Sequence, residues 1–149
     1  MLRTDTHDAP LAGNPATSAA VRELADKFVT FLETGEPPAG LFAPDLFCDL
    51  TVPLWRLQAQ GAEASVALRR GGHPWPGRVP RSRLDLTETG FVIEVEEEWE
   101  NDGQTFYCRE MMRADVSAAG ISQLSVYCTG DWDAAQVSRH AREVTLIRA

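Results

Sequence analysis

The chain has 149 residues, of which 44% are hydrophobic and 24% charged, a composition that predicts one globular domain with a single sizeable core. Its formal net charge of −8 argues against a nucleic acid or an anionic membrane surface as a partner. No apolar run approaches the roughly 20 residues that a membrane-spanning helix needs.

The first 16 residues lack an apolar core, so we expect a flexible tail rather than a secretory signal, followed by one domain over residues 17–149. Cys48, Cys108 and Cys128 fall in strand-like segments without paired spacing, which is typical of reduced, buried thiols in a cytoplasmic protein. Neither a CxxC nor an HExxH motif occurs. The sequence therefore predicts no metal site, and we expect no cofactor.

A long helix over Thr17–Thr34 is the first predicted element. Apolar residues, Phe28 and Phe31 among them, recur at helical spacing along this segment. A threonine or serine at its start can cap the first turn, and Gly35 can end the helix in a left-handed conformation.

The rest of the chain outside the central hairpin predicts a mixture of short helices and strands. In order these are a short helix over Ala39–Leu46, a strand over Phe47–Leu57, a helix over Ala62–Arg70, a strand over Arg81–Thr87, a strand over Ile121–Thr129 and a helix over Ala134–Arg142. Pro53 confines its strand to an edge or a bulge. His73, in a proline-rich loop, is a candidate proton carrier, although a solvated loop histidine is the simpler interpretation. Asp131 or Asp133 can cap the last helix.

The hairpin Phe91–Asp115 is the element around which we expect the chain to be organised. Its turn, Asp102-Gly103, supplies two residues that can take positive φ in a type I′ turn. A two-residue turn fixes the register, so that Trp99 faces Phe106 and Glu97 faces Cys108. One face is then apolar, and it holds Phe91, Ile93, Val95, Trp99, Phe106, Cys108, Met112 and Ala114.

Two carboxylates, Glu97 and Glu110, lie on that apolar face as diagonal neighbours roughly 7 Å apart at Cα. Each must find a partner, hold a proton or face a wet cavity, because a buried, unpaired charge costs several kcal/mol. Two interpretations stay open. Either Glu97 lies at the rim and Glu110 pairs with an arginine, or the two form an acid–base pair in a pocket, with Glu110 the deeper residue and the better base.

Helices followed by mostly antiparallel strands predict an α+β fold in which a curved sheet wraps around the long N-terminal helix. The segments VRELADKFVTFLETG, LFAPDLFCDLTVPLWRLQAQG, the hairpin and GISQLSVYCTGDWD resemble the nuclear transport factor 2-like superfamily, close to its SnoaL-like branch of polyketide cyclases and ketosteroid isomerases. The likeness covers Val21–Asp133. It implies a cystatin-like cone closed by the long helix, with a pocket between helix and sheet. It also implies frequent homodimers, which we expect to form through the outer face of the sheet.

The resemblance also implies a carboxylate base in that pocket. Asp49 lies about where the ketosteroid isomerases carry theirs. In the cyclases an acidic residue ends the last strand, whereas this chain has Thr129 at that position and Asp131 two residues later. Asp131 therefore stays open as a helix cap or as an acid in the pocket.

Two classes of function remain. The first is a cofactor-free isomerase, cyclase or lyase that acts on a small hydrophobic ring compound by acid–base catalysis, because burial raises the pKa of a carboxylate toward neutrality. Glu110, Glu97 or Asp49 would serve as base and acid. Tyr127 would donate a hydrogen bond to a developing enolate. The expected lining of the pocket is Phe28, Phe31, Trp55, Trp99, Phe106 and Met112. The second class is a binding module without chemistry, for a small ligand or a protein partner.

Overall fold

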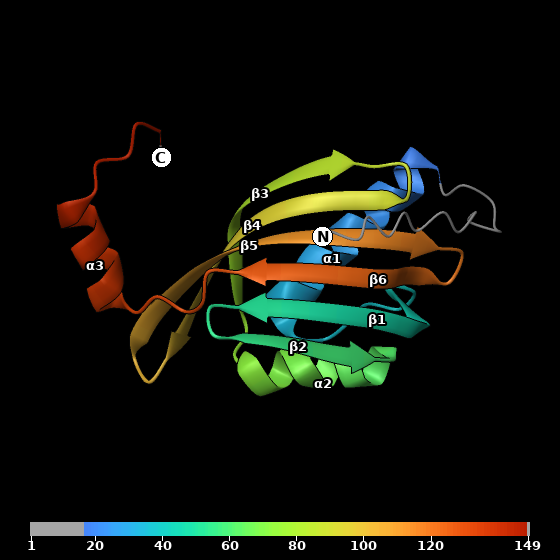
Figure 1. Ribbon diagram of the computed structural model, residues 1–149, viewed down its shortest axis with the longest axis horizontal. Helices are drawn as coiled ribbons and strands as arrows, with labels where there is room; N and C mark the ends of the chain where they lie inside the picture. The colour runs from blue at the N-terminus through green and yellow to red at the C-terminus, as the bar shows by residue number, and fades with distance from the viewer. Residues whose placement is uncertain (1–16, 149) are drawn as a thin grey trace, which may run out of the picture.

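The computed structural model describes residues 17–148, which form a curved six-stranded sheet and three helices (Figure 1). In chain order the elements are α1 (Ser18–Thr34), β1 (Phe42–Val52), β2 (Trp55–Gln60), α2 (Ala62–Gly72), β3 (Gly77–Leu86), β4 (Gly90–Asn101), β5 (Gln104–Ser117), β6 (Gly120–Cys128) and α3 (Ala134–Glu143). The expected flexible tail, residues 1–16, lies outside the described residues.

The strands lie in the order β2-β1-β6-β5-β4-β3. Neighbouring strands are antiparallel except β1 and β6, which run parallel although they are far apart in the sequence. Figure 1 shows α1 crossing one face of this sheet, with α2 beside β1 and β2. The predicted α+β class, with a mostly antiparallel sheet around the N-terminal helix, is confirmed.

The central hairpin has the predicted register. Trp99 pairs with Phe106 and Glu97 pairs with Cys108, and the pairing continues without a shift along β4 and β5. Asp102 and Gly103 both have positive φ, 50° and 73°, as a type I′ turn requires. Side chains on the predicted apolar face alternate with exposed or half-buried ones, so the hairpin contributes one continuous wall of the core.

α1 forms where the periodicity predicts it. The Thr17 side chain accepts a hydrogen bond from the Ala20 N–H at 3.2 Å, and Gly35 ends the helix with a φ of 73°. One face of the helix packs against the sheet, and it consists of Val21, Ala25, Phe28, Phe31 and Leu32. The amphipathic pattern therefore sets which face of α1 meets the sheet.

The short helix predicted over Ala39–Leu46 is wrong, because β1 already starts at Phe42. Pro44 disfavours the helical conformation of the residue before it, and the extended segment pairs instead with β6. The Leu41 carbonyl accepts a hydrogen bond from the Ile121 N–H at 2.8 Å. Pairing with a distant strand decides the conformation here.

The single strand predicted over Phe47–Leu57 is also wrong, because the chain turns at Pro53-Leu54 and returns as β2. Val52 pairs with Trp55 across this turn. Pro53 has no N–H to donate to a ladder, which makes it a natural end for β1. The other predicted strands and helices are present with ends shifted by a few residues.

The C-terminal helix α3 stands apart from the sheet beside the end of the β4–β5 hairpin (Figure 1). It buries none of its residues, and Trp132 links the preceding turn to Tyr107 of β5 through two backbone hydrogen bonds. Asp133, not Asp131, caps α3 by accepting a hydrogen bond from the Gln136 N–H at 2.7 Å. Among the described residues no helix is long and apolar enough to cross a bilayer.

The β5–β6 turn generates a test of the fold. Gly120 has a φ of 120°, and a Cβ there would lie 2.7 Å from the Leu41 carbonyl oxygen. We expect Gly120→Ala to lower the free energy of unfolding by about 1–3 kcal/mol, because both the φ and the contact are unfavourable. Gly71→Ala is the control, since its Cβ would meet open space and alanine favours the helix. Urea denaturation measures both, and equal stability of the two variants would contradict the close approach.

Candidate functional site

A cavity of about 130 Å³ lies between α1, α2 and the concave face of the sheet. Its wall is mostly apolar and includes Phe28, Phe31, Leu32, Phe42, Leu46 and Met112. An apolar cavity of about 150 Å³ in another protein binds benzene. The space therefore suits a compound with a single ring, and it falls below the roughly 300 Å³ at which drug-sized pockets begin.

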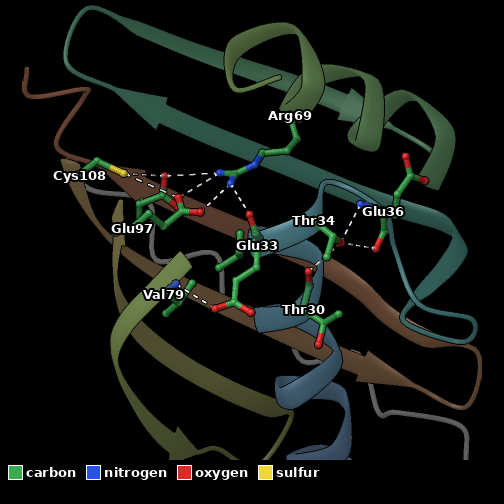
Figure 2. A network of polar contacts seen from close by, with 10 residues as sticks. Thr30, Glu33, Thr34, Glu36, Arg69, Val79, Glu97 and Cys108 are labelled. Carbon is green, nitrogen blue, oxygen red and sulfur yellow. Dashed lines mark hydrogen bonds and ion pairs between the residues drawn. The ribbon is translucent and has the colours of Figure 1, made fainter. Parts of the chain in front are cut away.

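The charged centre of the site is an ion pair between Arg69 and Glu97. Arg69 reaches from the last turns of α2 to Glu97 on β4, and the two nitrogen–oxygen distances are 2.6 Å and 3.1 Å (Figure 2). The same guanidinium donates to the Leu32 carbonyl at 3.1 Å, near the C-terminus of α1, where a cation is favoured. The two side chains are only 15% and 3% exposed. One arginine thus connects α1, α2 and β4.

Glu110, on β5, lies beside this pair and is less firmly bound. Its nearest Arg69 nitrogen is 4.0 Å away. The Cys108 thiol lies between the two carboxylates, 3.7 Å from Glu97 and 3.8 Å from Glu110. Burial, and next the negative charge of Glu97, raise the pKa of Glu110 well above its ordinary value, whereas Arg69 acts in the opposite direction. Glu110 therefore keeps its proton to a higher pH than an exposed glutamate does.

The expected depth of the two carboxylates is reversed. Glu97 is 2% exposed and Glu110 is 9% exposed, so Glu97 does not lie at the rim. The reason is that Arg69 and the end of α1 cover Glu97, whereas Glu110 borders the cavity. The interpretation with an arginine partner therefore applies to Glu97, which Arg69 contacts at 2.6 Å, more than to Glu110, which lies 4.0 Å from Arg69.

Two more titratable side chains, His73 and Cys128, line the same cavity. Desolvation, reinforced by the Arg69 charge, lowers the pKa of His73 to about 4, so the imidazole is neutral at neutral pH. The pKa of Cys128 is lowered to about 7, mainly by a hydrogen bond with Cys108. The same contact and burial raise the pKa of Cys108.

Cys108, Glu110 and Cys128 also present donor atoms that lie within 4.8 Å of one another. Two thiolates and a carboxylate are ligands that Zn²⁺ accepts. An ion at this position would lie against the Arg69 guanidinium, whose nitrogen is already 4.0 Å from Glu110. That fixed positive charge opposes a cation at this cluster.

Asp49 and Tyr127, two of the predicted catalytic residues, lie on the outer face of the sheet. Strand alternation directs Cys48 and Leu50 into the cavity and Asp49 away from it. Arg56 on β2 donates to the Asp49 carboxylate at 2.5 Å and 2.9 Å, and these bonds lower the pKa of Asp49. Tyr127 is 61% exposed. Neither side chain reaches the cavity.

Asp131, the fifth predicted catalytic residue, lies in the turn after β6 with a largely exposed side chain. Partial desolvation raises its pKa, while the Arg69 charge lowers it. It therefore lies within electrostatic reach of the buried cluster, but it does not line the cavity.

Three of the six expected lining residues, Phe28, Phe31 and Met112, border the cavity. Trp55 does not, because it lies on the edge strand β2 and is 67% exposed. Trp99 is buried beyond the cavity wall, with its ring 4.2 Å from His73 and 5.8 Å from the stacked ring of Phe106. Trp99 and Phe106 therefore support His73 rather than the cavity itself.

Sequence reasoning missed Arg69 as the partner of the buried carboxylates. One signal was available, since two carboxylates on an apolar face require a cation, and Arg69 ends a short amphipathic helix. Its position four residues after the buried Ser65 places it on the inward face of α2. The position of Cys128 beside Cys108 and Glu110 had no such signal, because it depends on which strand lies beside β6.

Comparisons with known proteins agree on the fold. Models of known protein families and curated proteins give no match. Among solved structures, the chain is similar to a nuclear transport factor 2-like protein of Anabaena variabilis, with a TM-score of 0.60, 19% identity and coverage of 74% of this chain and 87% of the other. A candidate isomerase of Rhodopseudomonas palustris follows at 0.58, with 11% identity and coverage of 75% and 91%. A candidate polyketide cyclase of Pseudomonas putida gives 0.56, with 15% identity and coverage of 72% and 90%.

The chain therefore has the nuclear transport factor 2-like fold that its sequence resembles. At these identities the likeness extends to the architecture, a curved sheet around a long helix, and the activity must be argued from the side chains in the cavity.

The buried ion pair generates the second prediction. Arg69→Met leaves Glu97 charged and unpaired in the interior, so we expect it to lower the free energy of unfolding by about 3–5 kcal/mol. The double variant Arg69→Met/Glu97→Gln should recover much of that loss, because no charge is then left alone. Arg56→Met is the matched control, since it breaks an exposed pair with Asp49 that solvent screens. A loss for Arg69→Met no greater than for Arg56→Met, in urea denaturation, would contradict the role of the pair.

Proposed function

We propose that this chain binds a small hydrophobic ring compound in the cavity and moves a proton on it, as an isomerase, cyclase or lyase. The observation that carries the proposal is the Glu110 carboxyl, which borders an apolar cavity with its nearest arginine nitrogen at 4.0 Å. Burial raises its pKa toward the range in which a carboxyl group exchanges protons near neutral pH. The fold neighbours that are candidate cyclases and isomerases support the same class of reaction.

The chemistry that suits this geometry is proton transfer next to a ring carbonyl, which needs no cofactor. The ionised Glu110 would remove a proton from the carbon beside the carbonyl and later return it at another position. The negative charge would then build up on the carbonyl oxygen, where the neutral His73 imidazole can donate a hydrogen bond. Arg69, near Glu110, would stabilise the ionised base without neutralising it.

Glu97 has a different part in this proposal. Its carboxylate is engaged by both terminal nitrogens of Arg69, so it is the positioning residue that holds the guanidinium in place. Its charge also raises the pKa of Glu110. Replacing Glu97 would therefore act on the reaction only through Arg69 and Glu110.

A binding module without chemistry is the alternative. The observation in its favour is that Arg69 lies within ion-pair distance of both buried carboxylates, as it would if its role were purely structural. In that case the cavity would hold a ring compound, and the bound compound would exchange no protons with the protein.

Deuterium exchange distinguishes the two functions. We expect the protein to accelerate exchange of the protons beside the carbonyl of cyclohexanone in D₂O, followed by NMR. The rate should rise with pH, because the base is the ionised carboxylate. The midpoint of this rise should lie above pH 4.5, the ordinary pKa of a glutamate side chain. Glu110→Gln should slow the exchange at least about a hundredfold, a typical contribution of a general base.

Glu98→Gln is the control, because Glu98 lies on the outer face of the same hairpin and pairs with Arg78. It should leave the exchange rate unchanged. Binding of cyclohexanone without faster exchange would favour the binding module. An active but destabilised Glu110→Gln would overturn the catalytic assignment.

Stability gives a separate check on the buried proton. The native state keeps the Glu110 proton above pH 4.5 while the unfolded chain loses it, so native stability falls as pH rises from 4.5 toward the raised pKa. Glu110→Gln removes this dependence. The thermal midpoint of the variant should therefore match that of the wild type at low pH and exceed it increasingly toward neutral pH, as measured by circular dichroism.

We also propose that the protein forms a homodimer through the outer face of the sheet. Met111 and Tyr127 pair across β5 and β6, and they are 46% and 61% exposed. Arginines on the same face offset its glutamates, as in the pairs Arg109–Glu96 and Arg78–Glu98. We expect light scattering to give a dimer at micromolar concentration and Tyr127→Glu to give a monomer. A monomeric wild type would remove this proposal.

A further inference from the structure

Cys128 occupies an unusual position for a strand cysteine, because its sulfur borders the cavity at the very end of β6. The Gly130 N–H donates to its Sγ at 3.3 Å. This contact requires the chain to turn back on itself, and Gly130 does so with a φ of 79°. A backbone donor aimed at sulfur favours the thiolate over the thiol.

The three cysteines of the chain provide an internal comparison. Cys48 also borders the cavity, but burial and the neighbouring Asp49 charge raise the pKa of its thiol to about 11. Cys108 is buried between two carboxylates and keeps its proton. Cys128 alone has a lowered pKa, about 7, so it is the one thiol with a substantial thiolate fraction at neutral pH.

The Glu110 carboxyl group, a potential proton donor, lies beside Cys128. The carboxyl oxygen of Glu110 and the sulfur of Cys128 lie within 4.8 Å of each other, and both groups border the cavity. Burial and the Glu97 charge raise the pKa of Glu110, so its carboxyl group keeps a proton to a higher pH than an exposed glutamate does. A nucleophile and an acid thus meet at one wall of a space that fits a single ring.

We propose that Cys128 captures small cyclic α,β-unsaturated carbonyl compounds by covalent addition inside the cavity, with Glu110 as the acid. The Sγ lone pair forms the carbon–sulfur bond at the β-carbon, and the electron pair of the carbon–carbon double bond moves to the carbonyl as an enolate. The Glu110 carboxyl gives its proton to the enolate. The products are a saturated ring ketone bound to sulfur and an ionised Glu110 beside Arg69, which regains a proton from water.

This activity goes beyond the proposed acid–base reaction, because it needs no turnover and uses a different nucleophile. The two can fail separately. Cyclohexanone has no double bond to accept sulfur, so the deuterium-exchange experiment does not test capture. An enone that labels Cys128 would leave the inference standing even if cyclohexanone exchanged no protons.

Mass spectrometry of the whole protein tests the inference directly. Incubation with cyclohex-2-en-1-one at neutral pH should add one equivalent to the intact mass, and peptide mapping should place it on Cys128. In the same sample Cys48 should react at least about ten times more slowly, because its thiolate fraction is far smaller even after allowance for its greater intrinsic nucleophilicity. This comparison needs no variant, so it does not depend on how a mutant folds.

Variants and a second probe complete the test. Cys128→Ser should lose the adduct, Cys48→Ser should keep it, and Glu110→Gln should slow its formation while the site of labelling stays the same. A steroid enone, too large for a cavity of about 130 Å³, should not label the folded protein. Equal labelling of Cys48 and Cys128, no labelling at all, or equal labelling by the steroid enone would overturn the inference.

Discussion

The rest of the site depends on one buried ion pair, between Arg69 and Glu97. A charged carboxylate on the concave face of a sheet is tolerated only if a cation reaches it and its oxygens are bonded. Arg69 meets both conditions, and it also bonds the Leu32 carbonyl, so that two helices and the central hairpin share a single side chain. Figure 2 shows how α2 delivers this arginine across the end of α1 to the hairpin.

The same pair determines the chemistry of its neighbours. Because Glu97 takes two of the guanidinium's nitrogens, Glu110 is left with a contact of 4.0 Å. Burial, and next the Glu97 charge, raise the pKa of Glu110. Burial, reinforced by the Arg69 charge, keeps His73 neutral. Cys108 remains protonated between the carboxylates and donates toward them, and its contact with Cys128 lowers the pKa of the second thiol. A carboxyl group with a raised pKa, a neutral imidazole and a thiol with a lowered pKa therefore border one small apolar space.

The architecture alone would not have selected these groups. Proteins with this fold at 11–19% identity are described in different terms, as an isomerase, a cyclase or simply by the fold. The chemistry of the cavity depends instead on which inward positions of β4, β5 and β6 carry polar residues: Glu97, Cys108, Glu110 and Cys128. The small cavity beside them has room for about one ring, which constrains the proposed function more than the fold does.

The sequence by itself determined the features that depend on short-range periodicity. The two-residue turn at Asp102-Gly103 dictated the hairpin register and hence placed Glu97 and Glu110 on the apolar face, and the helical repeat predicted the buried face of α1. Only the tertiary structure decided their partners. Arg69 and Glu97 are 28 residues apart and meet because α2 packs against the sheet, and Cys108 meets Cys128 because β6 lies beside β5. Arg56, the partner of Asp49 on the outer face, likewise comes from a neighbouring strand. Periodicity fixes which way a side chain points, whereas the neighbour that it meets depends on how distant segments pack.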